Sequence, residues 1–282
     1  MKRPLLYPAA LLSLLLFPSA CKKSTPQPAA NQAANPVAAS PTPNIEAALG
    51  EFIKRDQEAI RQNPNDSGNY YNLANLYFTA GKFPEAIEQY QQAIRLDPKD
   101  DAARYELGQC YLRLERYDEA FAAFNEALKL NPKNANVYHE MGNAHLKQER
   151  TKEALEAYQK ALSLKPDHAE VYFNLGNLYT KTAQTQEAAK AFQQATRHNP
   201  KDADAFFNLG GAYSRLKQFD NAINAYKEAL KLRPDDAEAH LWLAFVYLDK
   251  GNREAATAEY NVLKGLNPQL AATLDEKIKQ QK

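Results

Sequence analysis

The sequence predicts an all-α protein in which a pair of helices is repeated along the chain. The first observation is a proline that recurs at intervals of 34 residues, at Pro64, Pro98, Pro132, Pro166, Pro200, Pro234 and Pro268. The second is a small residue followed four positions later by an aromatic residue in every interval. A period of 34 residues is typical of a helix–turn–helix unit that buries its apolar face only by stacking on a neighbour. The chain is therefore expected to form a helical solenoid.

The columns of small and aromatic residues run through all six units. The small residue is Ala86, Ala120, Ala154, Ala188, Ala222 and Ala256, and the aromatic is Tyr90, Phe124, Tyr158, Phe192, Tyr226 and Tyr260. A second small residue follows at Ala93, Ala127, Ala161, Ala195 and Ala229, with Leu263 in the last unit. Alanine suits such positions because a larger side chain would hold two closely approaching helices apart.

The first helix of each unit carries a further pattern of an aromatic, a Leu-Gly pair and a tyrosine, as in Tyr172, Leu175, Gly176 and Tyr179. Together these columns resemble the tetratricopeptide repeat family. The resemblance implies a right-handed α-solenoid of six helix pairs, at residues 67–100, 101–134, 135–168, 169–202, 203–236 and 237–270. The departures do not interrupt the register: they are Arg104 and His240 for the aromatic, Met141 for leucine, His145 for tyrosine, and Ala74 and Ala244 for glycine.

A capping helix is expected at each end of the array. At residues 44–66, Ile45, Leu49, Phe52, Ile53 and Ile60 share one helical face behind Asn44 as the cap, which predicts an unpaired half-repeat. At residues 271–282, Leu274 and Ile278 continue a spacing of four that begins at Leu270 and predict a helix with one apolar edge. Both helices would seal the core of the array.

The first 43 residues differ in composition. A basic start and an apolar stretch from Leu5 to Phe17 predict a signal peptide at 1–20, because this stretch is too short for a comfortable membrane span. Ser19-Ala20-Cys21 resembles the lipobox of bacterial lipoproteins, which implies a lipidated Cys21. Pro18 stands where that family has leucine, so ordinary cleavage and an uncleaved signal anchor are the alternatives.

Residues 21–43 are rich in Pro, Ala, Gln and Asn, which predicts a disordered tether after the lipidated cysteine. Lys22 follows that cysteine where an aspartate would favour the inner membrane. The family rule therefore points to the periplasmic side of the outer membrane of a bacterial envelope.

Composition and motifs argue against catalysis and against nucleic acid. The chain has 35 basic and 34 acidic residues, without the positive excess that phosphate binding needs, and only two cysteines. Its five histidines show no metal-binding pair with a glutamate, and neither a Gly-x-Ser-x-Gly elbow nor a phosphate-binding loop occurs. His198 reads as a substitution in a column of leucines, and Cys110 as a buried thiol. We expect no catalytic, cofactor or metal site.

Function is instead expected on the face of the first helices that points away from the core, which lines the concave groove in the tetratricopeptide family. Its two columns are Asn72, Glu106, Glu140, Asn174, Asn208, Trp242 and Asn75, Gln109, Asn143, Asn177, Gly211, Phe245. Carboxamides offer a donor and an acceptor to the backbone of an extended peptide. The alternative is that asparagine is only a soluble residue on an exposed face. Trp242 and Phe245 are the candidate binding hot spots.

Two further sets flank these columns. The aromatic set is Tyr71, Tyr105, His139, Phe173 and Phe207, for which half-buried packing is favoured over ligand contact. The basic set is Arg113, Lys147, Lys181 and Arg215, at the ends of the first helices. Bases there complement the helix dipole at about 0.3–1 kcal/mol each, and the alternative is a basic groove rim for acidic partners. The family's clamp for acidic chain ends is not expected, since its places hold Tyr71, Asn75, Asn136 and Glu140.

The sequence thus predicts a non-catalytic scaffold, tethered to an envelope membrane, that binds an extended segment of a partner protein. Lipoproteins of similar layout assist pilus secretin assembly, outer-membrane assembly or cell-wall enzyme complexes. The other hypotheses are a homo-oligomer formed through edge or cap contacts, and an accessory subunit that recruits substrates to a separate enzyme.

Overall fold

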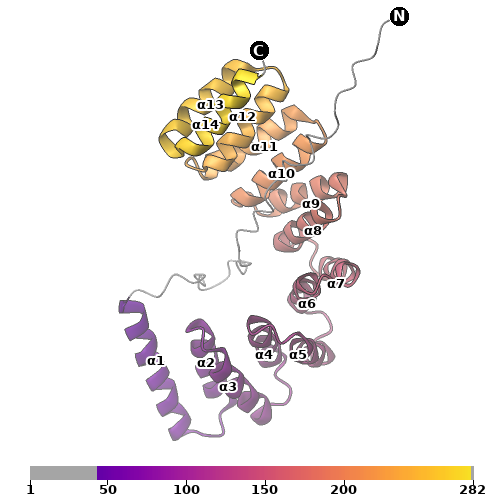
Figure 1. Cartoon of the computed structure of the whole chain (residues 1–282). Helices are drawn as coiled ribbons and strands as arrows, with labels where there is room; N and C mark the ends of the chain where they lie inside the picture. Colours follow the sequence, from indigo (N-terminus) through magenta and orange to yellow (C-terminus); the bar gives the residue numbers. More distant parts are fainter. Residues whose placement is uncertain (1–42, 281–282) are drawn as a thin grey trace, which may run out of the picture.

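The computed structural model describes residues 43–280, and the side chains from residue 48 onward. Every regular element in this range is an α-helix, which confirms the predicted all-α solenoid (Figure 1). The predicted signal peptide, Cys21 and the tether lie outside the described residues, as do the side chains of Asn44 and Ile45.

The helices form six antiparallel pairs between two single helices. The single helices are α1 (Pro43–Gln62) and α14 (Pro268–Gln280). The pairs are α2 (Ser67–Thr79) with α3 (Phe83–Leu96), α4 (Asp101–Arg113) with α5 (Tyr117–Leu130), α6 (Ala135–Lys147) with α7 (Thr151–Leu164), α8 (Ala169–Lys181) with α9 (Thr185–His198), α10 (Ala203–Arg215) with α11 (Phe219–Leu232), and α12 (Ala237–Asp249) with α13 (Arg253–Leu266). We number these pairs as repeats 1 to 6.

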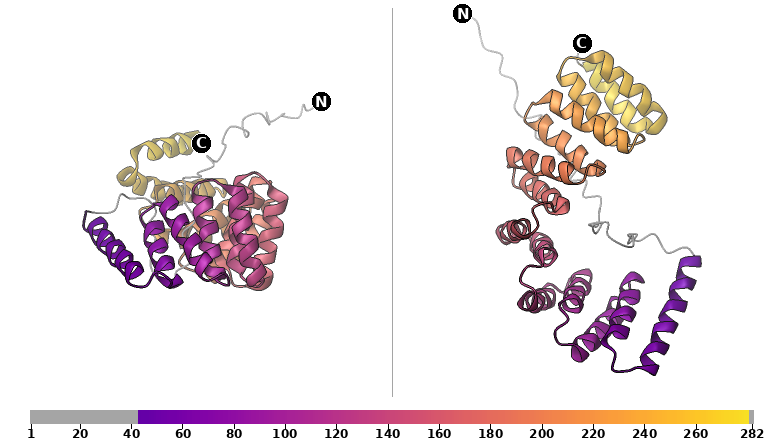
Figure 2. Two further views of the ribbon diagram at one scale, coloured as in Figure 1. Left: turned by 90° about the horizontal axis from the view of Figure 1, so that it is seen from below. Right: turned by 180° about the vertical axis from the view of Figure 1, so that it is seen from behind.

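The repeats stack into a curved array that runs from α1 to α14 (Figure 1). In the middle of the array the first helix of a pair lies on the inner side of the curve and the second on the outer side, as α4 and α5 or α6 and α7 show. The view from behind shows the same continuous curvature (Figure 2, right). The curvature gives the first helices a shared inner surface.

Polar caps and a left-handed turn residue define the ends of the helices. The Asp100 side chain accepts a hydrogen bond from the Ala103 backbone N at 2.8 Å, and Asp66, Asn134, Asp202 and Asp236 cap the corresponding helices. The turn inside each pair places one residue at positive φ, namely Gly81, Glu115, Glu149, Ala183, Lys217 and Gly251. Only two of the six are glycine, so this conformation was not evident from the sequence.

The core follows the columns of the sequence. The alanines of the first small column and the aromatics from Tyr90 to Tyr226 are 0–1% exposed, and Leu263 in the last unit is 0% exposed. Four of these aromatic rings lie directly against a glycine of the first helix. A Cβ on Gly142 would lie 2.5 Å from Cε1 of Tyr158, and a Cβ on Gly108, Gly176 or Gly210 would be similarly close to the ring beside it. Glycine is therefore required in these repeats by close approach of a ring.

The two end helices differ from the sequence prediction in detail. Helix α1 begins at Pro43, so Asn44 is inside the helix rather than before it. Phe52 was predicted to lie on the sealing face but is 47% exposed, because no preceding helix covers it among the described residues. The Arg55 guanidinium lies 5.2 Å from the centre of its ring. Helix α14 begins at Pro268 rather than at 271, and its Leu274 and Ile278 are buried as predicted.

Candidate functional site

The nine groove residues expected from the sequence lie on the first helices of the six pairs. Asn72 is exposed, and the other eight are half-buried. They are Asn72 and Asn75 on α2, Gln109 on α4, Asn143 on α6, Asn174 and Asn177 on α8, Asn208 on α10, and Trp242 and Phe245 on α12. We call the surface formed by these two columns the inner face.

Two asparagines of the inner face are hydrogen-bonded to core tyrosines. The Tyr158 hydroxyl donates to Oδ1 of Asn143 at 2.7 Å, and the Tyr90 hydroxyl donates to Oδ1 of Asn75 in the same way. Each tyrosine lies on the second helix of the same repeat, 15 residues further along the chain. These asparagines therefore satisfy a buried hydroxyl, a structural role that the sequence columns did not reveal.

A polar network joins repeats 3 and 4 across the inner face. The Asn174 side-chain nitrogen donates to Oδ1 of Asn143 at 2.9 Å and contacts Nε2 of His139 at 2.8 Å. His139 is 3% exposed, and burial lowers its pKa to about 4, with the positive charge of Lys165 as a second cause. Its Nε2 therefore acts as the acceptor of a neutral imidazole. Asn143 and Asn174 are therefore hydrogen-bonded to each other, and their side chains are not both available to a peptide.

The remaining carboxamides differ in their bonding. Gln109 donates to the Tyr105 hydroxyl at 2.7 Å, and Asn208 donates to the backbone oxygen of Asp204 at 2.8 Å. Asn72 and Asn177 make no side-chain hydrogen bond within the described part of the chain. Of the carboxamides expected in the two columns, these two are thus the ones without a side-chain hydrogen bond among the described residues.

The aromatic column that flanks the inner face packs on the core aromatics. Tyr71 lies against Tyr90 with ring centres 5.8 Å apart, and Phe207 lies against Tyr226 at 5.6 Å, both edge to face. Tyr105, His139 and Phe173 make the corresponding contacts with Phe124, Tyr158 and Phe192. The packing role favoured from the sequence is confirmed for all five, but His139 is buried rather than half-buried.

Three carboxylates give the middle of the inner face its charge. Burial raises the pKa of Glu106 to about 7, and the nearby charge of Glu140 adds to this effect. The pKa of Glu170 rises to about 7 for the same two reasons. Burial also raises the pKa of Glu140, while a hydrogen bond from Asn143 at 3.2 Å opposes the rise. Glu106 and Glu140 stood in the asparagine column of the sequence, where no role was assigned to them.

The basic residues expected as a rim are exposed at the ends of their helices. The Arg113 guanidinium lies 5.9 Å from the Phe78 ring centre, and Lys181 forms an ion pair with Glu149 at 3.4 Å. Lys147 and Arg113 lower the pKa of Glu140 through their charge. Burial lowers the pKa of Arg215 at the same position of repeat 5. Of these bases, Arg113 and Lys147 thus lie near a carboxylate of the inner face.

The inner face changes character in repeat 6. Trp242 and Phe245 occupy the two columns there and contact each other edge to face with ring centres 5.5 Å apart. Both rings are half-buried. Helix α12 also carries buried residues on its other faces, among them Leu241, Leu243 and Val246, so it is apolar on nearly all sides. The aromatic pair extends this apolar character to the inner surface.

The residues singled out as possible reactive groups, Cys110 and His198, are packed against other side chains. Cys110 is a free, fully buried thiol whose pKa burial raises to about 12, and His198 stacks on Tyr172 with ring centres 5.6 Å apart. The part of the chain that the structure describes holds no group of metal-binding side chains. Within residues 43–280 no helix combines the length and hydropathy that a membrane span needs.

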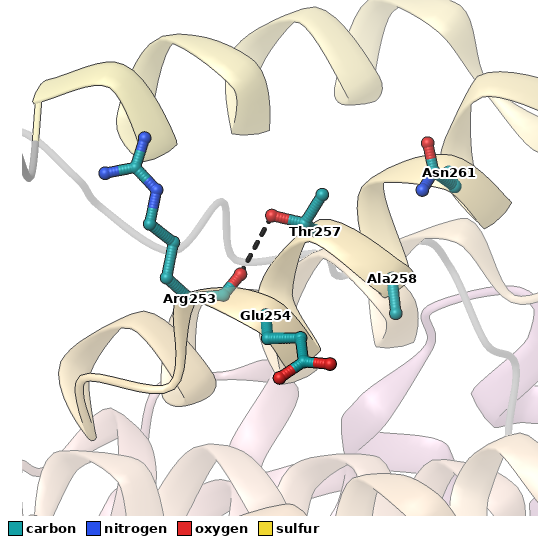
Figure 3. Close-up of a pocket in the computed structure, with 5 residues that line it drawn as sticks. All are labelled: Arg253, Glu254, Thr257, Ala258 and Asn261. Atoms are coloured by element: carbon teal, nitrogen blue, oxygen red, sulfur yellow. Dashed lines mark hydrogen bonds between the residues drawn. The ribbon is translucent and has the colours of Figure 1, made fainter.

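Two surface hollows lie away from the inner face. One of about 520 Å³ is bordered by Arg253, Glu254, Thr257, Ala258 and Asn261, all exposed on α13 (Figure 3). The Thr257 hydroxyl donates to the Arg253 backbone oxygen at 2.8 Å, so this polar group is already satisfied. The other, of about 1080 Å³, lies between repeats 2 and 3 and is lined by Leu107, Tyr138 and Met141 among others. The residues bordering the first hollow come from one helix, so no second element encloses a ligand there.

Comparison with known proteins identifies the repeats. A model described as "Tetratricopeptide repeat" matches residues 71–135, and one described as "Cilia and flagella-associated protein 70 C-terminal domain" matches residues 133–266. No curated protein matches the chain.

Solved structures share the fold. A chain of the APC/C hetero-tetramer Cut9–Hcn1 is 23% identical with a TM-score of 0.59, over 83% of this chain but only 46% of its own length. The pilF protein of Pseudomonas aeruginosa is 20% identical with a TM-score of 0.63, over 75% of this chain and 97% of its own. YrrB, described as "a TPR protein with an unusual peptide-binding site", is 30% identical with a TM-score of 0.50, over 65% and 95%.

The matched models and the shared fold agree with the columns of the core. Tetratricopeptide repeat proteins are generally non-catalytic scaffolds for protein interaction. The chain belongs to the tetratricopeptide repeat family.

Proposed function

We propose that the inner face binds an extended segment of a partner protein, without catalysis. The observation that carries this proposal is the row of polar and aromatic side chains, exposed or half-buried, on the first helices of all six repeats. Asn72 and Asn177 have carboxamides available to pair with peptide groups of such a segment. Trp242 and Phe245 offer it an apolar contact. The peptide-binding site named for YrrB supports the proposal.

The test uses photo-crosslinking amino acids placed at single positions in the living cell. Inner-face positions Asn72 and Asn177 are compared with Lys190, an exposed residue of α9 on a second helix. We expect adducts with one dominant foreign protein from the two inner positions and none from Lys190. Equal capture at all three positions, or capture from Lys190 alone, would contradict binding at the inner face. Adducts with a second copy of the chain would instead favour self-association.

We further propose that the array is held at a bacterial envelope membrane by lipid on Cys21, with the outer membrane favoured by Lys22. A tethered scaffold of this kind suits assembly of a pilus secretin or of outer-membrane proteins, or recruitment to an envelope enzyme complex. Cells fed a palmitate analogue should label the wild-type chain and leave the Cys21→Ala chain unlabelled. Labelling that persists in Cys21→Ala would exclude this anchor and leave the binding proposal untouched.

A further inference from the structure

The middle of the inner face carries carboxylates that lack a cationic partner. Glu106 on α4 and Glu140 on α6 are half-buried and stand at the same position of adjacent repeats, and Glu170 lies near Glu140 at the start of α8. No basic residue in the described part of the chain forms an ion pair with Glu106, Glu140 or Glu170. The side-chain hydrogen bonds that Glu140 accepts come from two neutral amides, Asn143 at 3.2 Å and Gln109. Negative charge on these groups is thus balanced by no ion pair in the part of the chain that the structure describes.

Nearby cations among the described residues form no ion pair with these carboxylates, although the charges of Arg113 and Lys147 lower the pKa of Glu140 and that of Lys165 lowers the pKa of Glu170. The Arg104 guanidinium donates to the backbone oxygen of Asp100 at 2.9 Å. Arg113 lies over the Phe78 ring, and neither it nor Lys147 reaches ion-pair distance of Glu140. Half-buried carboxylates lose part of their hydration without recovering it through a counter-ion. A cation supplied by a partner would offset this loss and would form charge-assisted hydrogen bonds.

The surroundings of the carboxylates favour an amino-acid cation over a metal ion. The described residues hold no group of acidic and histidine side chains close enough to coordinate a metal. Tyr71 and Tyr105 border the carboxylates, since the charge of Glu106 raises the pKa of both phenols. Aromatic rings beside carboxylates suit the apolar stem of lysine or the flat guanidinium of arginine.

The same columns offer a different contact in repeat 6. Trp242 occupies the column of Glu106 and Glu140, and Phe245 lies beside it with ring centres 5.5 Å apart. Packed helices lie about 8–10 Å apart, and an extended chain advances about 3.3 Å per residue, so a bound segment needs roughly three residues per repeat. Three repeats separate Glu140 from Trp242, which corresponds to about nine residues of an extended segment.

We propose that the inner face binds an extended segment that places a lysine or arginine over Glu106 and Glu140 and an apolar or aromatic side chain, about nine residues away, on Trp242 and Phe245. Charge complementarity favours the basic residue at the glutamates, and burial of apolar surface favours the apolar residue at Trp242 and Phe245. This inference rests on the proposed function and names the class of partner segment.

The test selects random 16-residue peptides, displayed on phage, against the purified full chain. Enriched peptides should contain a basic residue and an aromatic or large aliphatic residue separated by about nine positions. Binding of one such peptide is then measured by fluorescence anisotropy. We expect the Glu106→Gln/Glu140→Gln chain to bind it at least tenfold more weakly, and the Trp242→Ala/Phe245→Ala chain to lose affinity independently.

The matched control is Glu88→Gln/Glu156→Gln, which makes the same substitutions at exposed positions of α3 and α7. It should change affinity less than twofold. An equal loss in this control would show that only overall charge matters and would overturn the inference. Both glutamine variants should fold, because the inner-face variant removes charge from half-buried sites and the control alters exposed ones.

The remaining outcomes separate the inference from the proposed function. Peptides that lack basic residues, and whose binding depends on Trp242 and Phe245 but not on the glutamates, would overturn the basic-partner inference and leave binding at the inner face intact. Peptides insensitive to both pairs of substitutions, or no enrichment at all, would contradict both.

Discussion

Replacing Gly142 by alanine adds a methyl group where α6 crosses α7. The new Cβ would lie 2.5 Å from Cε1 and 2.6 Å from Cδ1 of Tyr158. Tyr158 is 0% exposed, and its hydroxyl donates to Asn143 at 2.7 Å, so the ring cannot turn away without disturbing this hydrogen bond. Either the ring or the helix must therefore move.

The expected loss follows from two costs and one opposing gain. An extra methyl group in a packed core costs about 1–3 kcal/mol, and replacing glycine by alanine inside a helix returns about 1 kcal/mol. Disturbing the hydrogen bond of Tyr158 adds about 1 kcal/mol to the cost. We expect the free energy of unfolding to fall by about 1–3 kcal/mol. Alanine occurs in the same column in repeats 1 and 6, at Ala74 and Ala244.

Urea unfolding of the purified chain, followed by the helical circular dichroism signal, measures this loss. The control is Gly265→Ala in α13, where a Cβ meets nothing within 4 Å and should stabilise the chain by about 0.5–1 kcal/mol. Because repeat arrays can unfold in steps, hydrogen exchange in α6 and α7 locates the change. A Gly142→Ala chain as stable as the wild type, beside a stabilised Gly265→Ala chain, would refute the steric reasoning.

Three other measurements test the structure. Lys217→Gly relieves a φ of 57° and should raise the free energy of unfolding by up to about 1 kcal/mol, seen as a higher melting temperature; no rise would contradict the strained turn. Asn143→Ala leaves the Tyr158 hydroxyl without its acceptor and should cost about 1–3 kcal/mol, whereas Asn177→Ala should leave stability unchanged and weaken peptide binding; the reverse result would exchange their roles. Glu106 is faced by Glu140, Tyr71, Tyr90 and Cys110, and its pKa of about 7 in the folded chain lies above the value of about 4.3 in the unfolded chain. The folded chain thus holds the extra proton between these values, so the contribution of Glu106 to stability falls as pH rises from about 5 to about 8. Glu106→Gln should remove this fall, being stabilising at pH 8 and nearly neutral at pH 5, and parallel stability curves for the two chains would refute it.

Much of the fold could be predicted because the repeat register assigns each residue to one side of a helix. The column from Ala86 to Ala256 was expected to lie between close helices and is buried throughout. The half-buried packing of Tyr71 and Phe207 was likewise expected and found. The exposure of Phe52 was not, since the register does not tell whether another helix covers the end of the array.

The candidate site was predictable only in its position. Periodicity places Asn143 and Asn177 in one column, but it does not distinguish them. Tyr158 lies beside the first, whereas Phe192 occupies the same position beside the second and has no hydroxyl to donate. One asparagine is therefore engaged by the core and the other is available to a partner.

The amino-acid sequence alone specifies the helical repeat, its register and the surface that faces away from the core, because these depend on the local periodicity of side chains. Only the tertiary structure shows which side chains of that surface are already hydrogen-bonded and which carboxylates are half-buried. These properties depend on contacts between neighbouring helices and on the curvature of the array. The asparagine surface expected from the sequence thereby becomes, in the structure, a surface with a carboxylate centre and an aromatic end.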